Sequence, residues 1–207
     1  MLLFNLLQNP LTAVWIIVAL LVAITIHEFS HAWTANFYGD PTAKLMGRLS
    51  PNPFAHLDLT GTIFLLIAGF GWGKPVIVNP RNFKNPVLDN IAVSLAGPIS
   101  NLMLAVILGL ILRFVTLPTG ILTAFEIIIF FNLVLMIFNL IPIPPLDGSK
   151  ILSLFVSEST FLAFQQIGIF ILFGLVIFSS FIPVIPLLLT KGVGFFYTLI
   201  TGQVFGL

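Results

Sequence analysis

Residues 11–38 read LTAVWIIVALLVAITIHEFSHAWTANFY, and this stretch decides the fold class. The chain carries no charged side chain before His27, and the apolar run exceeds the roughly 20 residues that a helix needs to cross a bilayer. Gly39-Asp40-Pro41 follows, with a glycine suited to a helix C-cap and a proline that cannot continue the helix. The stretch therefore predicts a transmembrane helix over 11–38.

The same helix contains the motif His27-Glu28-Phe29-Ser30-His31. Two histidines four residues apart lie within about 40° of each other on a helix, so both imidazoles can bind one metal ion. Glu28, roughly 100° round the helix, suits a general base that takes a proton from water bound to the metal, as in the zinc protease motif H-E-x-x-H. The alternative is a set of polar side chains that only stabilise helix packing, but ionisable residues inside an apolar span indicate a functional site.

Composition agrees with a membrane protein. The 207 residues are 58% hydrophobic and only 7% charged, with a mean hydropathy of +1.15, which leaves too few charged groups to cover a soluble core. The net charge of +1 and the lack of a basic stripe argue against a nucleic-acid partner. Since the chain has no cysteine, disulfides and thiolate ligands are excluded.

Four further apolar segments, at about 87–113, 121–141, 161–182 and 185–205, are predicted to span the membrane. Asn85-Pro86 provides a helix start, and the three prolines of 142–145 end the third span. Lys191, Gly192 and Gly194 leave open whether the last segment crosses. We therefore expect an all-α polytopic membrane protein, a single domain over 1–207 with a bundle of about four to six transmembrane helices.

The region 42–82 differs from the long apolar segments, because prolines divide it into short runs that are typical of strands and loops. The apolar stretch 60–72 is too short to cross, so a small membrane-associated β or re-entrant element is predicted between the first two spans. Five of the eight basic residues lie in 44–84, which places this loop on the cytoplasmic side by the positive-inside rule. We expect a multi-pass protein of the plasma membrane.

A catalytic zinc takes three protein ligands and leaves the fourth position for water. His56 and Asp147 are the candidates for the third ligand. An imidazole in a loop, as at His56, is more often a structural hydrogen-bonding group. Asp147 is favoured, because it follows a proline-broken helix end where unwound backbone can direct a short carboxylate into a bundle, and Gly148 permits the turn.

These residues resemble the site-2 protease family of intramembrane zinc metalloproteases. His27–His31 is similar to the zinc motif of the family, and the stretch from Asn139 to Asp147-Gly148 is similar to its second motif, in which an Asp-Gly pair supplies the third ligand. The sequence 94–101, SLAGPISN, is similar to a Gly-x-x-x-Asn element whose asparagine, here Asn101, helps to hold the substrate backbone. The chain resembles the short members, which lack PDZ and CBS domains.

The resemblance implies a zinc metalloendopeptidase that cleaves transmembrane segments of membrane-anchored proteins, in regulated intramembrane proteolysis. It implies one zinc ion per chain held by His27, His31 and Asp147, with Glu28 as the catalytic base and Asn139 supporting the ligands. The loop 70–80 is similar to a loop that forms β-structure beside the active site in the short members. We expect an exposed strand edge there to hold the substrate extended, through five residues: Trp72, Gly73, Lys74, Pro75 and Val76.

A metal transporter or channel is the competing function. It would be expected to carry metal-binding groups along a path and to have pseudo-symmetric halves, and neither is visible in the sequence. An iron desaturase or hydroxylase needs many more than the three histidines present. The expected partners are a transmembrane substrate and the lipid bilayer, while an accessory regulator and a homo-oligomer both remain open.

Overall fold

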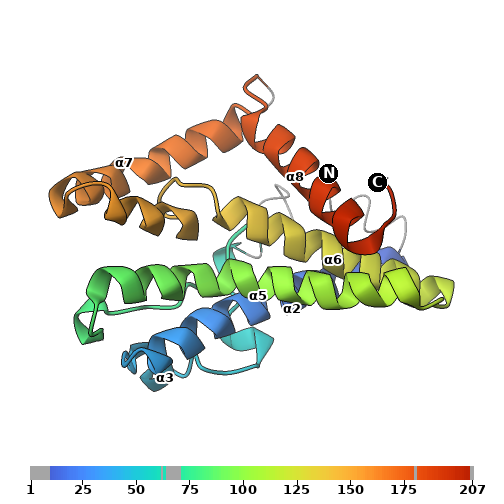
Figure 1. Ribbon diagram of the computed structural model, residues 1–207, viewed down its shortest axis with the longest axis horizontal. Coiled ribbons are helices and arrows are strands. Elements are labelled where there is room, and N and C mark those ends of the chain that lie inside the picture. Colours follow the sequence, from blue (N-terminus) through green and yellow to red (C-terminus); the bar gives the residue numbers. More distant parts are fainter. Residues whose placement is uncertain (1–9, 62, 64–70, 180, 206–207) are drawn as a thin grey trace.

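The computed structural model describes residues 10–61, 63, 71–179 and 181–205. Five long apolar helices dominate the chain (Figure 1): α2 (Pro10–Phe37), α5 (Pro86–Phe114), α6 (Thr119–Asn139), α7 (Glu158–Ile177) and α8 (Val184–Thr201). Each is long and apolar enough to cross a membrane. The predicted all-α, multi-pass architecture is confirmed, and the last apolar segment forms a helix of spanning length despite the exposed Lys191.

The start of α5 shows how local chemistry sets a helix boundary. Pro86 occupies the first helical position, as predicted, where its missing N–H costs nothing. Asn85 lies at the N-cap position, but its side chain makes no capping bond. Instead, the carboxylate of Asp89 accepts a hydrogen bond from the Asn85 backbone N–H at 2.9 Å. This acidic group in the first turn also suits the positive end of the helix dipole.

The helices α2, α5 and α6 pack side by side and form the centre of the molecule (Figure 1). A buried apolar cluster joins α5, α6 and α8: Ala105, Leu112, Ile129, Leu133, Met136, Ile137, Val193, Tyr197 and Ile200. Figure 1 shows α7 and α8 diverging from the turn that joins them, with α7 away from α2. The three central helices are therefore the elements that can bring distant polar side chains together.

The predicted β element is wrong for the described residues of 42–82. They include three short helices, α3 (Thr42–Leu45), η1 (Pro53–Ala55) and η2 (Pro80–Asn82), further helical residues at 59–61 and 63, and one isolated bridge between Leu57 and Gly73. The prolines lack the N–H that a ladder needs, and the N–H of Val76 is bonded to a side chain rather than to a neighbouring strand. Residues 62 and 64–70, which make up most of the predicted re-entrant stretch, lie outside the described residues.

Asp40 attaches the end of this loop to the end of α2. Its buried carboxylate accepts hydrogen bonds from the Asn79 N–H at 2.7 Å, from Asn82 Nδ2 at 2.7 Å and from the N–H and hydroxyl of Thr42. Burial by itself would raise the pKa of Asp40, but these hydrogen bonds outweigh it and lower the pKa below its usual value. The ionised carboxylate thus holds the segment that follows Gly73 against α2.

Candidate metal centre

The two histidines of α2 are buried against α5, and α5 sets the orientation of both rings. His31 Nδ1 donates to the backbone carbonyl of Val93 at 2.7 Å, since a carbonyl can only accept. His27 Nδ1 lies 2.7 Å from Oδ1 of Asn101, which is likewise an acceptor. Each ring therefore carries its proton on Nδ1, which leaves the Nε2 lone pair free for a metal.

Gly97 allows α5 to approach these rings. A Cβ at this position would lie 2.5 Å from His31 Nε2 and 2.6 Å from His27 Cε1, closer than real contacts allow. The following residue, Pro98, is also buried within α5. The glycine of the 94–101 element thus serves the packing of α5 against the two imidazoles.

Asp147 reaches the histidines from the segment that follows α6. It is the first residue of η3 (Asp147–Leu154), and its Oδ2 lies 3.1 Å from His27 Nε2 and 3.3 Å from His31 Nε2. The turn needs glycine at the next position, because a Cβ on Gly148 would collide with the backbone carbonyl of Leu140. In the Asp-Gly pair, the aspartate thus supplies the carboxylate, and the glycine supplies the space that the turn needs.

The three groups fit a zinc ion. Their ligand atoms form a triangle with edges of 3.0, 3.1 and 3.3 Å. A tetrahedral zinc with bonds of about 2.0–2.1 Å holds its ligand atoms about 3.3 Å apart. Asp147 Oδ2 is buried without a hydrogen-bond partner, as expected for an atom that binds a cation. Two imidazoles and one carboxylate also form a known catalytic zinc donor set that leaves one position open.

Glu28, next to His27, is held by the loop that follows Gly73. Its Oε2 accepts a hydrogen bond from the Val76 backbone N–H at 3.0 Å, and the side chain is partly buried. Gly73 lies beside Ile24, since a Cβ there would approach the Ile24 side chain to 3.2 Å. The loop thus passes along α2 within one turn of His27, and it contacts the carboxylate of the motif.

The other predicted site residues are placed as follows. Trp72, Lys74 and Pro75 are exposed. Asn101 has no exposed surface, and its amide is bonded within the protein, so the structure places it behind His27 rather than in an open site. Asn139 donates to the carbonyl of Leu135 in its own helix.

His56 is not part of the metal group. It is fully buried in the loop, where its Nε2 donates to the carbonyl of Ser50 at 2.8 Å. The metal group of the described residues comprises His27, His31 and Asp147. The arrangement thus agrees with the choice of Asp147 over His56 as candidate third ligand.

Two contacts escaped the sequence analysis. Asn132 on α6 bonds to Asn101, and the backbone of Val76 bonds to Glu28. The first contact could have been predicted, because Asn132 lies in the middle of an apolar span and a buried amide needs hydrogen-bond partners. No signal in the sequence indicates the second, since a backbone N–H is present at almost every residue.

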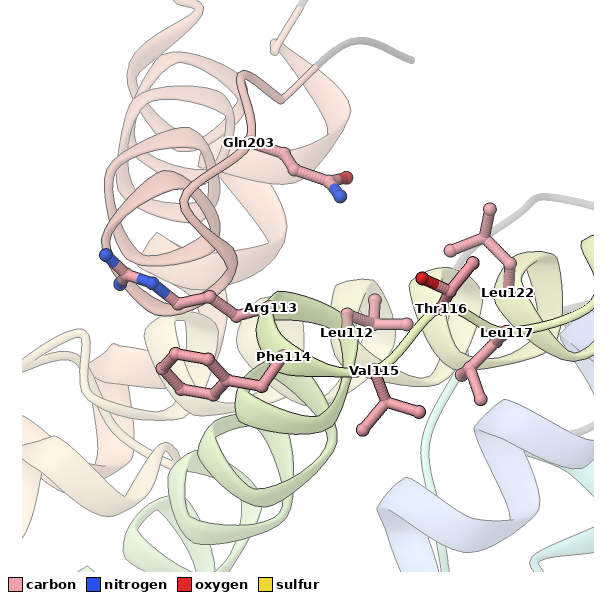
Figure 2. Close-up of a pocket in the computed structure, with 8 residues that line it drawn as sticks. All are labelled: Leu112, Arg113, Phe114, Val115, Thr116, Leu117, Leu122 and Gln203. Carbon is pink, nitrogen blue, oxygen red and sulfur yellow. The ribbon is translucent and has the colours of Figure 1, made fainter.

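The cavity shown in Figure 2 is separate from the metal group. It lies at the turn between α5 and α6, and its lining residues, which include Leu112, Arg113, Thr116 and Gln203, do not include the metal group. In the picture, the guanidinium of Arg113 points toward the end of α8. An apolar groove beside α2, lined by Leu21, Val22, Thr25, Ile26, Phe29, Pro51 and Pro53, lies much closer to the motif.

Comparison with known proteins agrees with this chemistry. A protein of Bacillus subtilis named "Putative zinc metalloprotease YwhC" is 47% identical over 147 residues, which are 67% of each chain. Rip2 of Mycobacterium tuberculosis, which carries the same description, is 36% identical over 141 residues, or 65% of this chain and 54% of Rip2. Stage IV sporulation protein FB of Bacillus subtilis is 28% identical over 150 residues, which cover 42% of that protein. The chain spans about half the length of Rip2, and no solved structure is significantly similar to it.

The profile of peptidase family M50 matches residues 15–118 and 115–179. The two matches cover most of the chain, and they include both α2 with its histidines and the Asp-Gly pair after α6. YwhC and Rip2 are both named "Putative zinc metalloprotease", and five helices of this chain have the length and apolarity of membrane spans. The chain therefore belongs to peptidase family M50, the site-2 protease family, and is a multi-pass membrane metalloendopeptidase.

Proposed function

We propose that this protein hydrolyses peptide bonds within the transmembrane segments of membrane-anchored substrates, as in regulated intramembrane proteolysis. The observation that carries the proposal is the depth of the metal group. His27 lies ten residues before the end of α2, about 15 Å along the helix, which is well inside a hydrocarbon layer of about 30 Å. A bond cut at this depth belongs to a segment that itself lies in the membrane.

His27, His31 and Asp147 are the residues that we assign to one zinc ion, and Glu28 is the residue that we assign to proton transfer. Zinc supplies Lewis-acid activation of water and of the scissile carbonyl when it is bound. The Val76 N–H holds Oε2 of Glu28, so the other carboxylate oxygen is the one we assign to the water proton. Glu28 then returns this proton to the leaving amine.

We assign the substrate to the loop that contacts Glu28. The apolar groove between α2 and the Pro51–Pro53 loop lies on the side of α2 that carries Ile26 and Phe29, whereas the imidazoles of His27 and His31 face α5. Trp72, Lys74 and Pro75 are exposed on the loop that contacts Glu28, which supports their assignment to the substrate. The five basic residues of 44–84 favour a cytoplasmic position for this loop in the cell membrane.

The direct test is cleavage by the zinc-loaded protein in liposomes. The substrate is a single-span peptide labelled at both ends, and mass spectrometry of the products locates the cut. We expect cleavage inside the membrane-spanning part, loss of cleavage with a zinc chelator, and recovery when zinc is added back. Cuts confined to the flanking soluble parts, or faster cleavage of a soluble peptide, would overturn the proposal.

Val76→Pro tests the contact between the loop and Glu28. The substitution removes the N–H that Glu28 Oε2 accepts, and a hydrogen bond to a charged group contributes about 1.5–3 kcal/mol. We expect cleavage to slow by at least about tenfold while zinc content stays at the wild-type level. Val76→Ala, which keeps the N–H, is the matched control and should cleave at a near wild-type rate. Equal rates for the proline and alanine variants would show that the contact has no part in catalysis.

A further inference from the structure

A line of buried polar side chains leads from the metal group into the helix bundle. It begins at His27 on α2, continues through Asn101 on α5 and ends at Asn132 on α6. Both asparagines have no exposed surface, and Asn132 lies in a helix that is otherwise strongly apolar. Buried amides in such surroundings are costly unless every polar atom is bonded, so the contacts of these two residues define what they do.

The direction of each hydrogen bond is set by the next one. Asn132 Nδ2 donates to the carbonyl of Ile128 at 2.8 Å, which turns its Oδ1 toward Asn101. Asn101 Nδ2 donates one proton to that Oδ1 at 2.9 Å and the other to the carbonyl of Ala23 at 3.0 Å. With both amide protons used, Asn101 presents its oxygen to His27, and His27 Nδ1 donates to it at 2.7 Å.

The reverse orientation of the Asn101 amide would prevent metal binding. A flipped amide would point an N–H at His27 Nδ1, which could then only accept. The proton of the neutral ring would move to Nε2, the atom that faces Asp147 Oδ2. The oxygen of Asn132 opposes this flip together with the carbonyl of Ala23, because a flipped Asn101 would place its own oxygen against both of these acceptors.

We propose that Asn132 is a positioning residue for the metal centre. Acting through Asn101, it holds His27 in the tautomer whose Nε2 lone pair binds zinc. The inference rests on the proposed zinc site. It assigns Asn101 to the support of a ligand, where the resemblance assigned it to the substrate, and it gives a role to a residue outside the three motifs.

The test compares Asn132→Leu with Asn132→Asp. Leucine has a similar volume and no acceptor, whereas a buried aspartic acid in its neutral form can donate to Ile128 and accept from Asn101. Zinc affinity is measured for the detergent-solubilised protein by competition with a chromophoric chelator. We expect N132L to weaken zinc binding by about 10–100-fold, as other supporting residues do, and N132D to stay within a few-fold of wild type.

A spectroscopic readout separates positioning from packing. With three histidines in the chain, ¹⁵N NMR of histidine-labelled protein can resolve His27. Without zinc, we expect protonated Nδ1 in the wild type and a mixture of tautomers in N132L. Thr201→Val is the control, because it removes a buried hydroxyl that donates to the Tyr197 carbonyl and accepts from the Gln203 N–H, and it should change neither result. Asn132→Ser, too short to reach Asn101, replaces N132L if leucine prevents folding.

The outcomes distinguish this inference from the proposed function. If the wild type binds no zinc, the proposed metal site itself fails. If the wild type binds zinc and N132L binds it equally well with an unchanged His27 tautomer, only the role of Asn132 is overturned. Equal losses in N132L and N132D would also overturn it, because the acceptor at this position would then not matter.

Discussion

Glu28→Gln is expected to retain zinc and to lose cleavage by at least about a hundredfold, the lower end of what general acid–base catalysis contributes. The amide has the shape of the carboxylate but cannot accept the proton of water. Its oxygen can still accept the hydrogen bond from the Val76 N–H, so the loop stays in place. The substitution therefore removes the proton acceptor and little else.

The measurement is the single-turnover rate on the labelled transmembrane peptide, together with zinc per protein. Glu158→Gln is the matched control, since Glu158 is exposed at the start of α7, and its rate should equal that of the wild type. Cleavage by the Glu28 variant at a near wild-type rate would remove Glu28 from its assigned role.

Asp147→Ala is expected to empty the metal centre. The carboxylate is the one anionic member of the metal group found among the described residues, and two neutral imidazoles cannot complete the three-ligand set of a catalytic zinc. Zinc affinity should fall by more than the roughly 10–100-fold expected for residues that only support a ligand. Cleavage should disappear with the metal.

His56→Gln is the matched control for this loss, because glutamine keeps a donor for the Ser50 carbonyl. Zinc per protein is measured for both variants after mild chelation. We expect the His56 variant to keep its zinc and the Asp147 variant to lose it. The opposite pattern would overturn the ligand assignment and would make His56 the third ligand.

The sequence also led to an error in the region 42–82. Its short apolar runs separated by prolines are typical of strands, and the resemblance pointed to β-structure as well. A strand, however, needs a neighbour that accepts its hydrogen bonds, and in the described residues the Val76 N–H bonds to Glu28 and the Asn79 N–H to Asp40. The local sequence pattern predicts a preference for extended backbone, but the groups that accept its hydrogen bonds depend on how the loop packs on α2.

The sequence by itself determined the five helices and the pair His27 and His31. Both depend on short-range rules, since apolar length sets a membrane span and a spacing of four residues places two side chains on one helical face. Asp147, which lies 116 positions after His31, could be nominated from its proline-rich context, but only the packing of α6 and η3 brings it within 3.3 Å of both rings. The tertiary structure alone decided that Asn101 faces His27, that Asn132 stands behind it and that Val76 contacts Glu28. Such contacts join elements that are remote in the chain, and a buried amide or backbone N–H bonds to whichever group the packing brings near.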